Sequence, residues 1–343
     1  MKLTFEQIKS ACSGAVSITQ EQDGIHFYRM HPQQVQAARE QEEAFFNRAQ
    51  ATSGVKLTFC TDSPRLALDV NVISTGVRAY YALDVCVDGK LVGSLDNYSH
   101  VENIHLTRYA EVPFVNSGSN AGCFELGEGE KTVCIHLPYS KICVIRNLSL
   151  EDGASFIPAT PEKKLLFFDD SITQGYDALH PSQTYASRIA AALGMAEYNK
   201  GIGGITFCPG MAEVKEDFTP DAIVVAYGTN DWSKIPTVEL FRERCSQMYR
   251  AISNHYPNTP VFALGPILQR GSNGCRRMGA FCKVGKIIEE IVADIPNTTF
   301  VDGLTFLPWS AHYYADGAVH PNDRGFEYYC KGLLPQMKAV LEG

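Results

Sequence analysis

The sequence lacks several patterns that would place it at a membrane or outside the cell. No run of about 18 apolar residues occurs, which is the length that a membrane-spanning helix needs. The N-terminal stretch MKLTFEQIKSACSG contains polar side chains where a signal peptide requires a continuous apolar region. We therefore expect a soluble, cytoplasmic chain with no membrane partner.

An excess of positive charge is also missing. The formal net charge is -8 and the isoelectric point lies near 5.6. No block of like charge suggests an interaction tail. This balance argues against a nucleic-acid partner and favours a small or neutral molecule. The sequence leaves the oligomeric state open.

Metal-binding cysteine patterns are absent as well. The chain has 11 cysteines, an odd number, and no C-x-x-C pair. Four of them, Cys60, Cys86, Cys134 and Cys143, fall within alternating, strand-like stretches. We interpret them as reduced and mostly buried, and we expect no structural zinc.

The first 150 residues show the two-residue period of β-strands. In residues 65–72 (RLALDVNV) apolar side chains alternate with polar ones, which indicates a half-buried antiparallel strand. Asp88 and Gly89 lie between two apolar runs and predict a hairpin with a type I′ turn. Residues 131–137 and 142–150 predict a second pair of strands. A helix-forming stretch at residues 33–50 predicts a short surface helix.

Two domains of different class follow from this pattern. The stretch GASFIPATP at residues 153–161 contains two prolines and has no periodicity, so we place the boundary there. Residues 1–158 are expected to form an all-β sandwich or jelly roll. Residues 159–343 alternate short apolar runs with helical stripes. They predict an α/β fold, a three-layer, doubly wound, five-stranded parallel sheet.

Polar residues gather where the predicted parallel strands end. The blocks are DSITQG (170–175), NKGIGG (199–204), YGTNDW (227–232) and DGAVHPND (316–323). Each alone fits a turn or the start of a helix. The carboxyl ends of parallel strands share one edge of the sheet, where ligands bind, so the four blocks are expected to meet in one crevice.

In this order the four blocks resemble those of the SGNH hydrolases, also called GDSL esterases, and the resemblance covers about residues 163–341. It implies that Ser171 is the nucleophile and His320 the general base. It also implies an oxyanion hole formed by Gly204, Asn230 and the backbone N–H of Ser171. No metal and no organic cofactor is implied.

The sequence departs from the family pattern at two positions. Asp169 replaces the glycine of Gly-Asp-Ser and places a side chain that can carry a charge next to the expected nucleophile. The family's catalytic acid usually stands three residues before the histidine, where this chain has Gly317. Asp316, four residues before His320, could complete a triad, could leave that role to a backbone carbonyl, or could only shape the turn. We expect it to complete the triad, because Gly317 makes the segment pliable.

These groups predict ester hydrolysis, because an imidazole that takes the serine proton turns a weak nucleophile into an effective one. The two-domain arrangement resembles family-two carbohydrate esterases and related bacterial acetyl esterases, which implies an acetyl or other short-chain ester carried by an oligosaccharide. Tyr176 and Trp232 could wall an acyl pocket, stack on a sugar or belong to the core. The alternatives are a lipase, lysophospholipase or thioesterase, or a catalytically weak carbohydrate-binding protein. We expect Ser171 in a solvent-facing turn, and loops of the β domain along one wall of the crevice.

Overall fold

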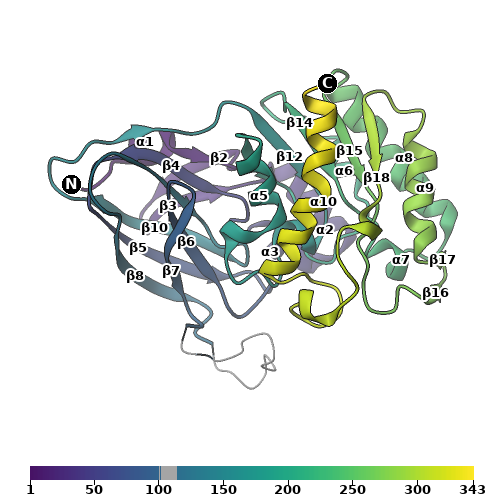
Figure 1. The fold of residues 1–343 in the computed structure, drawn as a ribbon, viewed down its shortest axis with the longest axis horizontal. Coiled ribbons are helices and arrows are strands. Elements are labelled where there is room, and N and C mark those ends of the chain that lie inside the picture. Colours follow the sequence, from purple (N-terminus) through teal and green to yellow (C-terminus); the bar gives the residue numbers. More distant parts are fainter. Residues whose placement is uncertain (100, 102–113) are drawn as a thin grey trace.

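The computed structural model describes residues 1–99, 101 and 114–343, and within them the chain forms two halves (Figure 1). The half that contains the N-terminus is built of β-strands. The other half has a sheet between helices and ends with the helix that contains the C-terminus.

Two antiparallel sheets face each other in the β half and form a sandwich. One contains, in spatial order, β1 (Cys12–Ser13), β4 (Lys56–Thr61), β9 (Lys131–His136), β6 (Ala82–Val87) and β7 (Lys90–Asp96), with β11 (Ile157–Pro158) beside β4. The other contains β2 (Ser17–Glu21), β3 (Gly24–Tyr28), β10 (Lys141–Leu150), β5 (Arg65–Ser74) and β8 (Gly118–Glu125). The apolar side chains of β5 are buried between the sheets, as the two-residue period predicts: Leu66, Leu68, Val70 and Val72.

The predicted hairpin is confirmed, whereas the pairing predicted between residues 131–137 and 142–150 is wrong, although both segments form strands. Asp88 and Gly89 have φ angles of 48° and 76°, both positive as a type I′ turn requires, and they join β6 to β7. β9 and β10, in contrast, belong to different sheets. The short link between them therefore carries the chain from one sheet to the other. Tyr139 in this link is buried, and its ring packs against Tyr176 of the other half.

The second half is the predicted three-layer α/β domain. Its five parallel strands lie in the order β13 (Ala196–Asn199), β12 (Lys164–Phe168), β14 (Ala222–Val225), β15 (Val261–Leu264) and β18 (Thr298–Val301). One face packs on α5 (Tyr185–Ala192) and α10 (Asp323–Leu341), the other on α8 (Val238–His255) and α9 (Cys282–Val292). The sheet is therefore buried on both faces, which explains the continuous apolar run of β12.

Shorter elements complete the chain, and none of the described helices has the length and apolarity needed to cross a membrane. These elements are α1 (Phe5–Ser10), α4 (Ser171–Gln174), α6 (Pro209–Ala212), α7 (Asp231–Lys234), β16 (Cys275–Arg276) and β17 (Gly279–Ala280).

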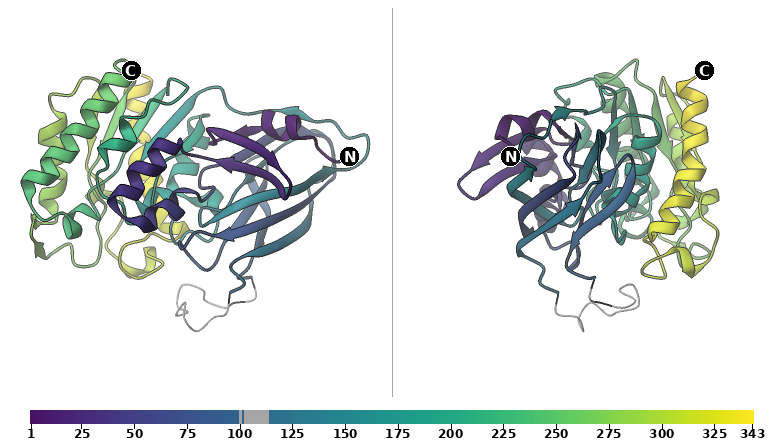
Figure 2. Two further views of the ribbon diagram at one scale, coloured as in Figure 1. Left: turned by 180° about the vertical axis from the view of Figure 1, so that it is seen from behind. Right: turned by 60° about the vertical axis from the view of Figure 1, so that its left-hand side comes forward.

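The stretch predicted as one surface helix forms two helices that pack on the α/β half. Extended backbone at Glu42, with φ -161°, separates α2 (Pro32–Gln41) from α3 (Glu43–Ala49). Ala38, Phe45 and Ala49 belong to the core on the α8–α9 face of the parallel sheet. Seen from behind, both helices lie across the junction of the halves (Figure 2). The prediction of a surface helix is wrong, and the division at residues 158–159 stays a prediction.

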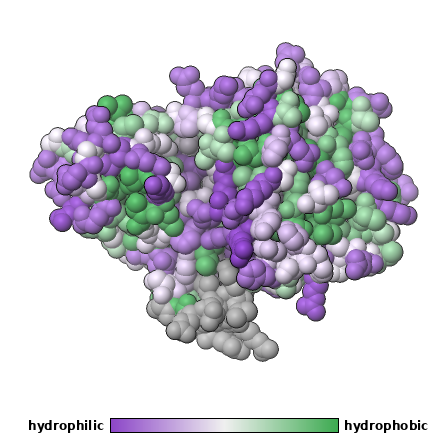
Figure 3. All heavy atoms as spheres, viewed as in Figure 1, coloured by the Kyte–Doolittle hydropathy of each residue, from purple (hydrophilic) through white to green (hydrophobic). Residues whose placement is uncertain are grey.

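Polar contacts also join the halves, and hydrophilic residues cover much of the junction on the face shown in Figure 3. The guanidinium group of Arg29 is buried and donates hydrogen bonds to the carbonyls of Ala51 and Asn199. Ion pairs among the described residues also connect the halves, among them Lys56 with Glu197 at 2.8 Å, Arg78 with Asp177 at 2.6 Å, and Asp84 with His180 at 3.0 Å.

The packing of α3 predicts different effects for two adjacent phenylalanines. Phe45 is 2% exposed and lies in the α/β core, whereas Phe46 is partly exposed under Arg39. We expect Phe45→Ala to lower the free energy of unfolding by about 3–5 kcal/mol and Phe46→Ala by less than half of that. Urea denaturation of both variants tests this, and equal losses would contradict the packing of α3 described above.

Candidate active site

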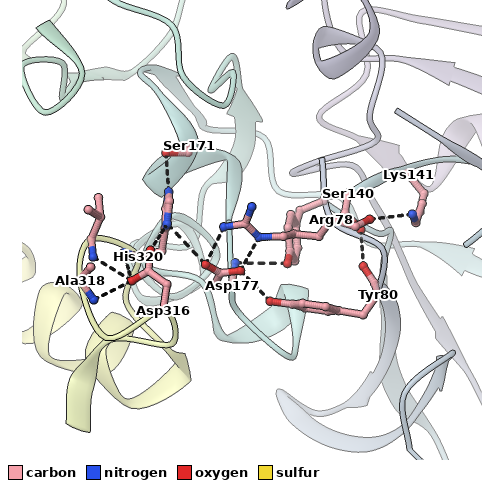
Figure 4. A network of polar contacts seen from close by, with 11 residues as sticks. Arg78, Tyr80, Ser140, Lys141, Ser171, Asp177, Asp316, Ala318 and His320 are labelled. Atoms are coloured by element: carbon pink, nitrogen blue, oxygen red, sulfur yellow. Dashed lines mark hydrogen bonds and ion pairs between the residues drawn. The ribbon is translucent and has the colours of Figure 1, made fainter. Parts of the chain in front are cut away.

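Ser171 begins the short helix α4, three residues after β12 ends. Asp170 caps this helix, because its carboxylate accepts a hydrogen bond from the N–H of Ile172 at 2.9 Å. Gly175, with φ 104°, ends the helix in the left-handed conformation. Ser171 is only 5% exposed, so the prediction of a solvent-facing turn is wrong. Its hydroxyl lies inside the crevice, 2.9 Å from the Nε2 atom of His320 (Figure 4).

Asp316 contacts the other imidazole nitrogen. Its Oδ2 atom is 2.7 Å from Nδ1 of His320, and its Oδ1 atom accepts hydrogen bonds from the N–H groups of Ala318, Val319 and His320. Gly317 has φ 65° and allows this tight turn. In this arrangement Nδ1 donates to the carboxylate, which leaves Nε2 to accept the proton of Ser171.

A second carboxylate, which the sequence analysis missed, lies at the same nitrogen. Oδ2 of Asp177 is 3.4 Å from Nδ1 of His320. Its carboxylate also accepts two hydrogen bonds from Arg78, at 2.6 and 2.8 Å, and one from Tyr80 at 2.7 Å. Figure 4 shows this network running from Ser171 through His320 to the strands of the β half.

Only part of this network had a signal in the sequence. Asp177 follows the DSITQG block by two residues and could have been considered as a charged neighbour of the nucleophile. Arg78 lies about a hundred positions earlier, in a segment whose pattern predicts no chemistry, so only the folded structure brings it to the site.

Both carboxylates stay ionised. Burial alone would raise the pKa of Asp316, but the hydrogen bond and charge of His320 outweigh it and hold that pKa well below its usual range. Burial also acts on Asp177, and there the hydrogen bonds and charge of Arg78 lower the pKa. The imidazolium that forms when Ser171 loses its proton therefore faces negative charge.

The three predicted oxyanion-hole groups lie just after the carboxyl ends of β12, β13 and β14. Within the described part of the chain, the backbone N–H groups of Ser171 and Gly204 have no recorded acceptor. The side-chain amide of Asn230 donates to Asp170 at 2.9 Å and to the carbonyl of Ile205 at 3.2 Å. The Asn230 amide could donate to an oxyanion if its longer bond, to the carbonyl of Ile205, breaks when substrate binds. The assignment of all three groups stays a prediction.

Tyr176 lies beside His320. Its ring is stacked on that of His320 with 5.4 Å between centroids, and the guanidinium of Arg78 lies 4.7 Å from its centre. A Cβ atom at Gly203 would come within 2.0 Å of the Tyr176 hydroxyl, so this close approach requires glycine. At 6% exposure, the ring supports the imidazole and has little surface left for a sugar.

Trp232 does not face the crevice. It is 2% exposed, its indole N–H donates to the carbonyl of Gly279 at 2.9 Å, and its ring packs edge-on against Phe281. The prediction that Trp232 contacts substrate is corrected by this position, because the ring belongs to the core beside α9.

Asp169, which replaces the family's glycine, is buried. Its carboxyl group forms a short hydrogen bond with Thr173, and its Oδ1 atom is buried without a recorded partner among the described residues. Burial raises the pKa of Asp169 well above its usual range, and the neighbouring charge of Asp170 adds to this. Asp169 therefore adds volume but no charge next to Ser171.

Two groups among the described residues bring three potential metal ligands together. Asp177, Asp316 and His320 are one group, but their atoms already bond to Arg78, to backbone amides and to each other. The other group, Glu21, Asp23 and His26, lies on a hairpin of the β half, and both of its carboxylates are exposed. The prediction of a metal-free mechanism remains untested.

A cavity of about 480 Å³ adjoins Gly204. Its walls come from α2, α3 and α8 as well as from the loop after β13. Charged and polar side chains line much of it, among them Glu40, Gln41, Thr206 and Arg244.

The raised pKa of Asp169 predicts a pH-dependent effect on stability. The folded state holds the Asp169 proton above the pH at which the unfolded chain releases it, so this group costs stability as the pH rises from about 4. Asp169→Asn removes that cost, and we expect its gain in unfolding free energy over the wild type to grow between pH 4 and pH 8.

Asp316→Asn is the matched control, because the folded-state pKa of Asp316 is lowered. The stabilisation by Asp316 is present above about pH 4 and is lost as the pH falls through its folded-state pKa. The loss in Asp316→Asn should therefore be full at pH 8 and shrink below pH 4. Denaturant titrations of the wild type and both variants, from below pH 4 to pH 8, measure the two differences in unfolding free energy. A pH-independent difference between Asp169→Asn and the wild type would show that Asp169 is ionised in the fold.

Solved structures with the same fold cover both halves. The salicylyl-acyltransferase SsfX3 from a tetracycline biosynthetic pathway superposes with a TM-score of 0.76 at 20% identity, over 96% of this chain and 94% of that one. A family-two carbohydrate esterase from Clostridium thermocellum, in complex with cellohexaose, gives 0.62 at 16% identity over 85% and 94%. Another from Cellvibrio japonicus gives 0.62 at 15% identity over 98% and 97%.

No curated protein matches the chain by sequence. The model of the GDSL-like lipase/acylhydrolase family matches residues 167–328, which span β12, the Ser171 helix, the Gly204 and Asn230 loops and His320. This agrees with the resemblance of the four sequence blocks to SGNH hydrolases. Residues 167–328 therefore match the GDSL-like lipase/acylhydrolase family, which is the family that the four sequence blocks resemble.

Proposed function

We propose that the protein is a serine esterase that removes short acyl groups, acetyl above all, from carbohydrate. The observation that carries the proposal is the chain of contacts at one edge of the sheet. The Ser171 hydroxyl is 2.9 Å from Nε2 of His320, and Asp316 is 2.7 Å from Nδ1 of the same ring.

The first half of the reaction acylates Ser171. His320 takes the hydroxyl proton at Nε2 as Oγ attacks the ester carbon, and Asp316 stabilises the imidazolium. Negative charge then develops on the former carbonyl oxygen, where the N–H groups of Ser171 and Gly204 and the amide of Asn230 can receive it. When the tetrahedral intermediate collapses, His320 returns the proton to the leaving alcohol.

The second half releases the acyl group. A water molecule replaces the alcohol, gives its proton to Nε2 of His320 and attacks the acyl carbon, and the same donors hold the oxyanion. When the second tetrahedral intermediate collapses, His320 returns the proton to Oγ of Ser171, which releases the free acid and restores the serine. Each half needs one base and one set of oxyanion donors, so the groups described above suffice.

The lining of the cavity beside Gly204 supports a polar substrate. A long acyl chain needs a predominantly apolar channel, whereas carboxylate, amide and guanidinium groups line much of this space. This favours a sugar ester over the lipase, lysophospholipase and thioesterase alternatives. Several proteins that share the fold are described as carbohydrate esterases, and one as an acetyl xylan esterase.

Acyl transfer is the second candidate, because an acyltransferase shares this fold over both halves. Hydrolysis and transfer pass through the same acyl-enzyme and differ only in whether water or another acceptor takes the acyl group. Measuring free acetate against acetylated acceptor, with an acetylated oligosaccharide as donor and a second sugar as acceptor, separates them. Acetate as the dominant product supports hydrolysis.

The nucleophile prediction is tested by Ser171→Ala. We expect p-nitrophenyl acetate hydrolysis to fall by at least about 10³-fold with an unchanged unfolding midpoint, because the variant removes one oxygen atom. The wild type should release p-nitrophenol faster from the acetyl than from the octanoyl ester. Activity retained in pure Ser171→Ala would exclude this residue as nucleophile, and a wild type that cleaves neither ester would favour a carbohydrate-binding protein.

Two asparagine variants separate the carboxylates at Nδ1. Asp316 lies closer to the imidazole, while Asp177 shares its oxygens with Arg78 and Tyr80. We expect Asp316→Asn to lower kcat by about 10⁴-fold and Asp177→Asn by about tenfold on the same acetyl ester. His320→Ala provides the reference for complete loss. If Asp316→Asn loses less than Asp177→Asn, Asp177 is the catalytic carboxylate.

A further inference from the structure

The peptide group between Gly203 and Gly204 has two ends with separate partners. Its N–H, on Gly204, is a proposed oxyanion donor. Its carbonyl oxygen, on Gly203, accepts a hydrogen bond of 2.7 Å from Nη1 of Arg48. The two ends belong to one conjugated group, so a charge at the carbonyl acts on the N–H.

Arg48 reaches this peptide from the N-terminal half of the chain. It lies on α3, which packs on the α/β core through Phe45 and Ala49. Among the described residues no carboxylate forms an ion pair with Arg48, so its charge is not neutralised there. A Cβ atom on Gly204 would lie 3.1 Å from Nη1 of Arg48, which shows how closely the guanidinium approaches the loop.

We propose that Arg48 is a positioning residue that strengthens the oxyanion hole by polarising the Gly203–Gly204 peptide, an inference that rests on the proposed esterase function. A charged donor at the carbonyl draws electron density from the amide nitrogen and makes its N–H a stronger donor. The same bond fixes the orientation of the peptide before substrate arrives. Both effects act where negative charge develops, so they lower the barrier more than they tighten substrate binding.

The neighbouring peptide offers a matched control. Lys234 donates a hydrogen bond of 2.5 Å to the carbonyl of Gly204. The N–H of that peptide belongs to Ile205 and donates to the carbonyl of Ile202 at 3.2 Å, so it does not face the oxyanion. Lys234 therefore brings a positive charge to the same loop without acting on the oxyanion peptide.

The test compares Arg48→Met, Arg48→Lys and Lys234→Met in the full chain. We expect Arg48→Met to lower kcat on p-nitrophenyl acetate by about tenfold, less than the loss of a whole donor, with KM changed less than about twofold. A short alkyl boronic acid, which forms a tetrahedral adduct on Ser171, should lose affinity by the same factor. Arg48→Lys should recover most of the loss, and Lys234→Met should lose less than about threefold.

Thermal unfolding of each variant accompanies the kinetics, and Arg48→Lys, which keeps the charge, decides the matter if Arg48→Met does not fold. Equal losses in Arg48→Met and Lys234→Met would overturn the proposal, since the loop would then respond to charge in general. A rise in KM with unchanged kcat, or unchanged boronic acid affinity, would also overturn it. Failure of the proposed function is distinct, because the wild type itself would then release no acid from any ester.

Discussion

A partly buried ion pair between Arg78 and Asp177 joins the two halves of the chain beside the imidazole of His320. Breaking a buried pair by removing one partner typically costs about 3–5 kcal/mol, because a charge is left without compensation. The Lys56–Glu197 and Asp84–His180 pairs lie in the same junction. Such pairs add little net stability to the fold. They disfavour any other arrangement of the two halves, because a displaced half would leave charges without partners. The junction thus fixes where the β half lies relative to the nucleophile.

The active site consequently depends on both halves. Ser171 and His320 come from the α/β half. Two residues of the other half, Arg78 and Arg48, contact groups beside them. Arg78 donates hydrogen bonds to the carboxylate of Asp177 and so holds it near Nδ1 of His320, the proposed general base. Arg48 bonds to the peptide that presents the N–H of Gly204, which is a proposed oxyanion donor. We interpret the β half as part of the catalytic framework, whatever further surface it offers to a substrate.

Local pattern predicts much of this fold, and it fails where distant segments decide the outcome. The two-residue period and the Asp88 turn depend on neighbouring residues, so they could be predicted. Four polar blocks at strand ends meet because the topology of a parallel sheet requires it. The exchange of sheets between β9 and β10, the docking of α2 and α3, and the burial of Trp232 depend on what packs against them. The contact between Arg78 and Asp177 could not be predicted from the sequence, because the two residues are far apart along the chain and meet only after folding.

The position of Asp316 shows which part of a sequence pattern is physical. The chemistry requires an acceptor at Nδ1 of the histidine, and it does not require a fixed number of intervening residues. Gly317 takes a left-handed conformation, which absorbs one more residue than the family pattern has. The longer turn also directs three backbone N–H groups at the second oxygen of Asp316, so the carboxylate is held from both sides. A departure in spacing that weakened the prediction from sequence therefore still brings a carboxylate within 2.7 Å of Nδ1 of His320.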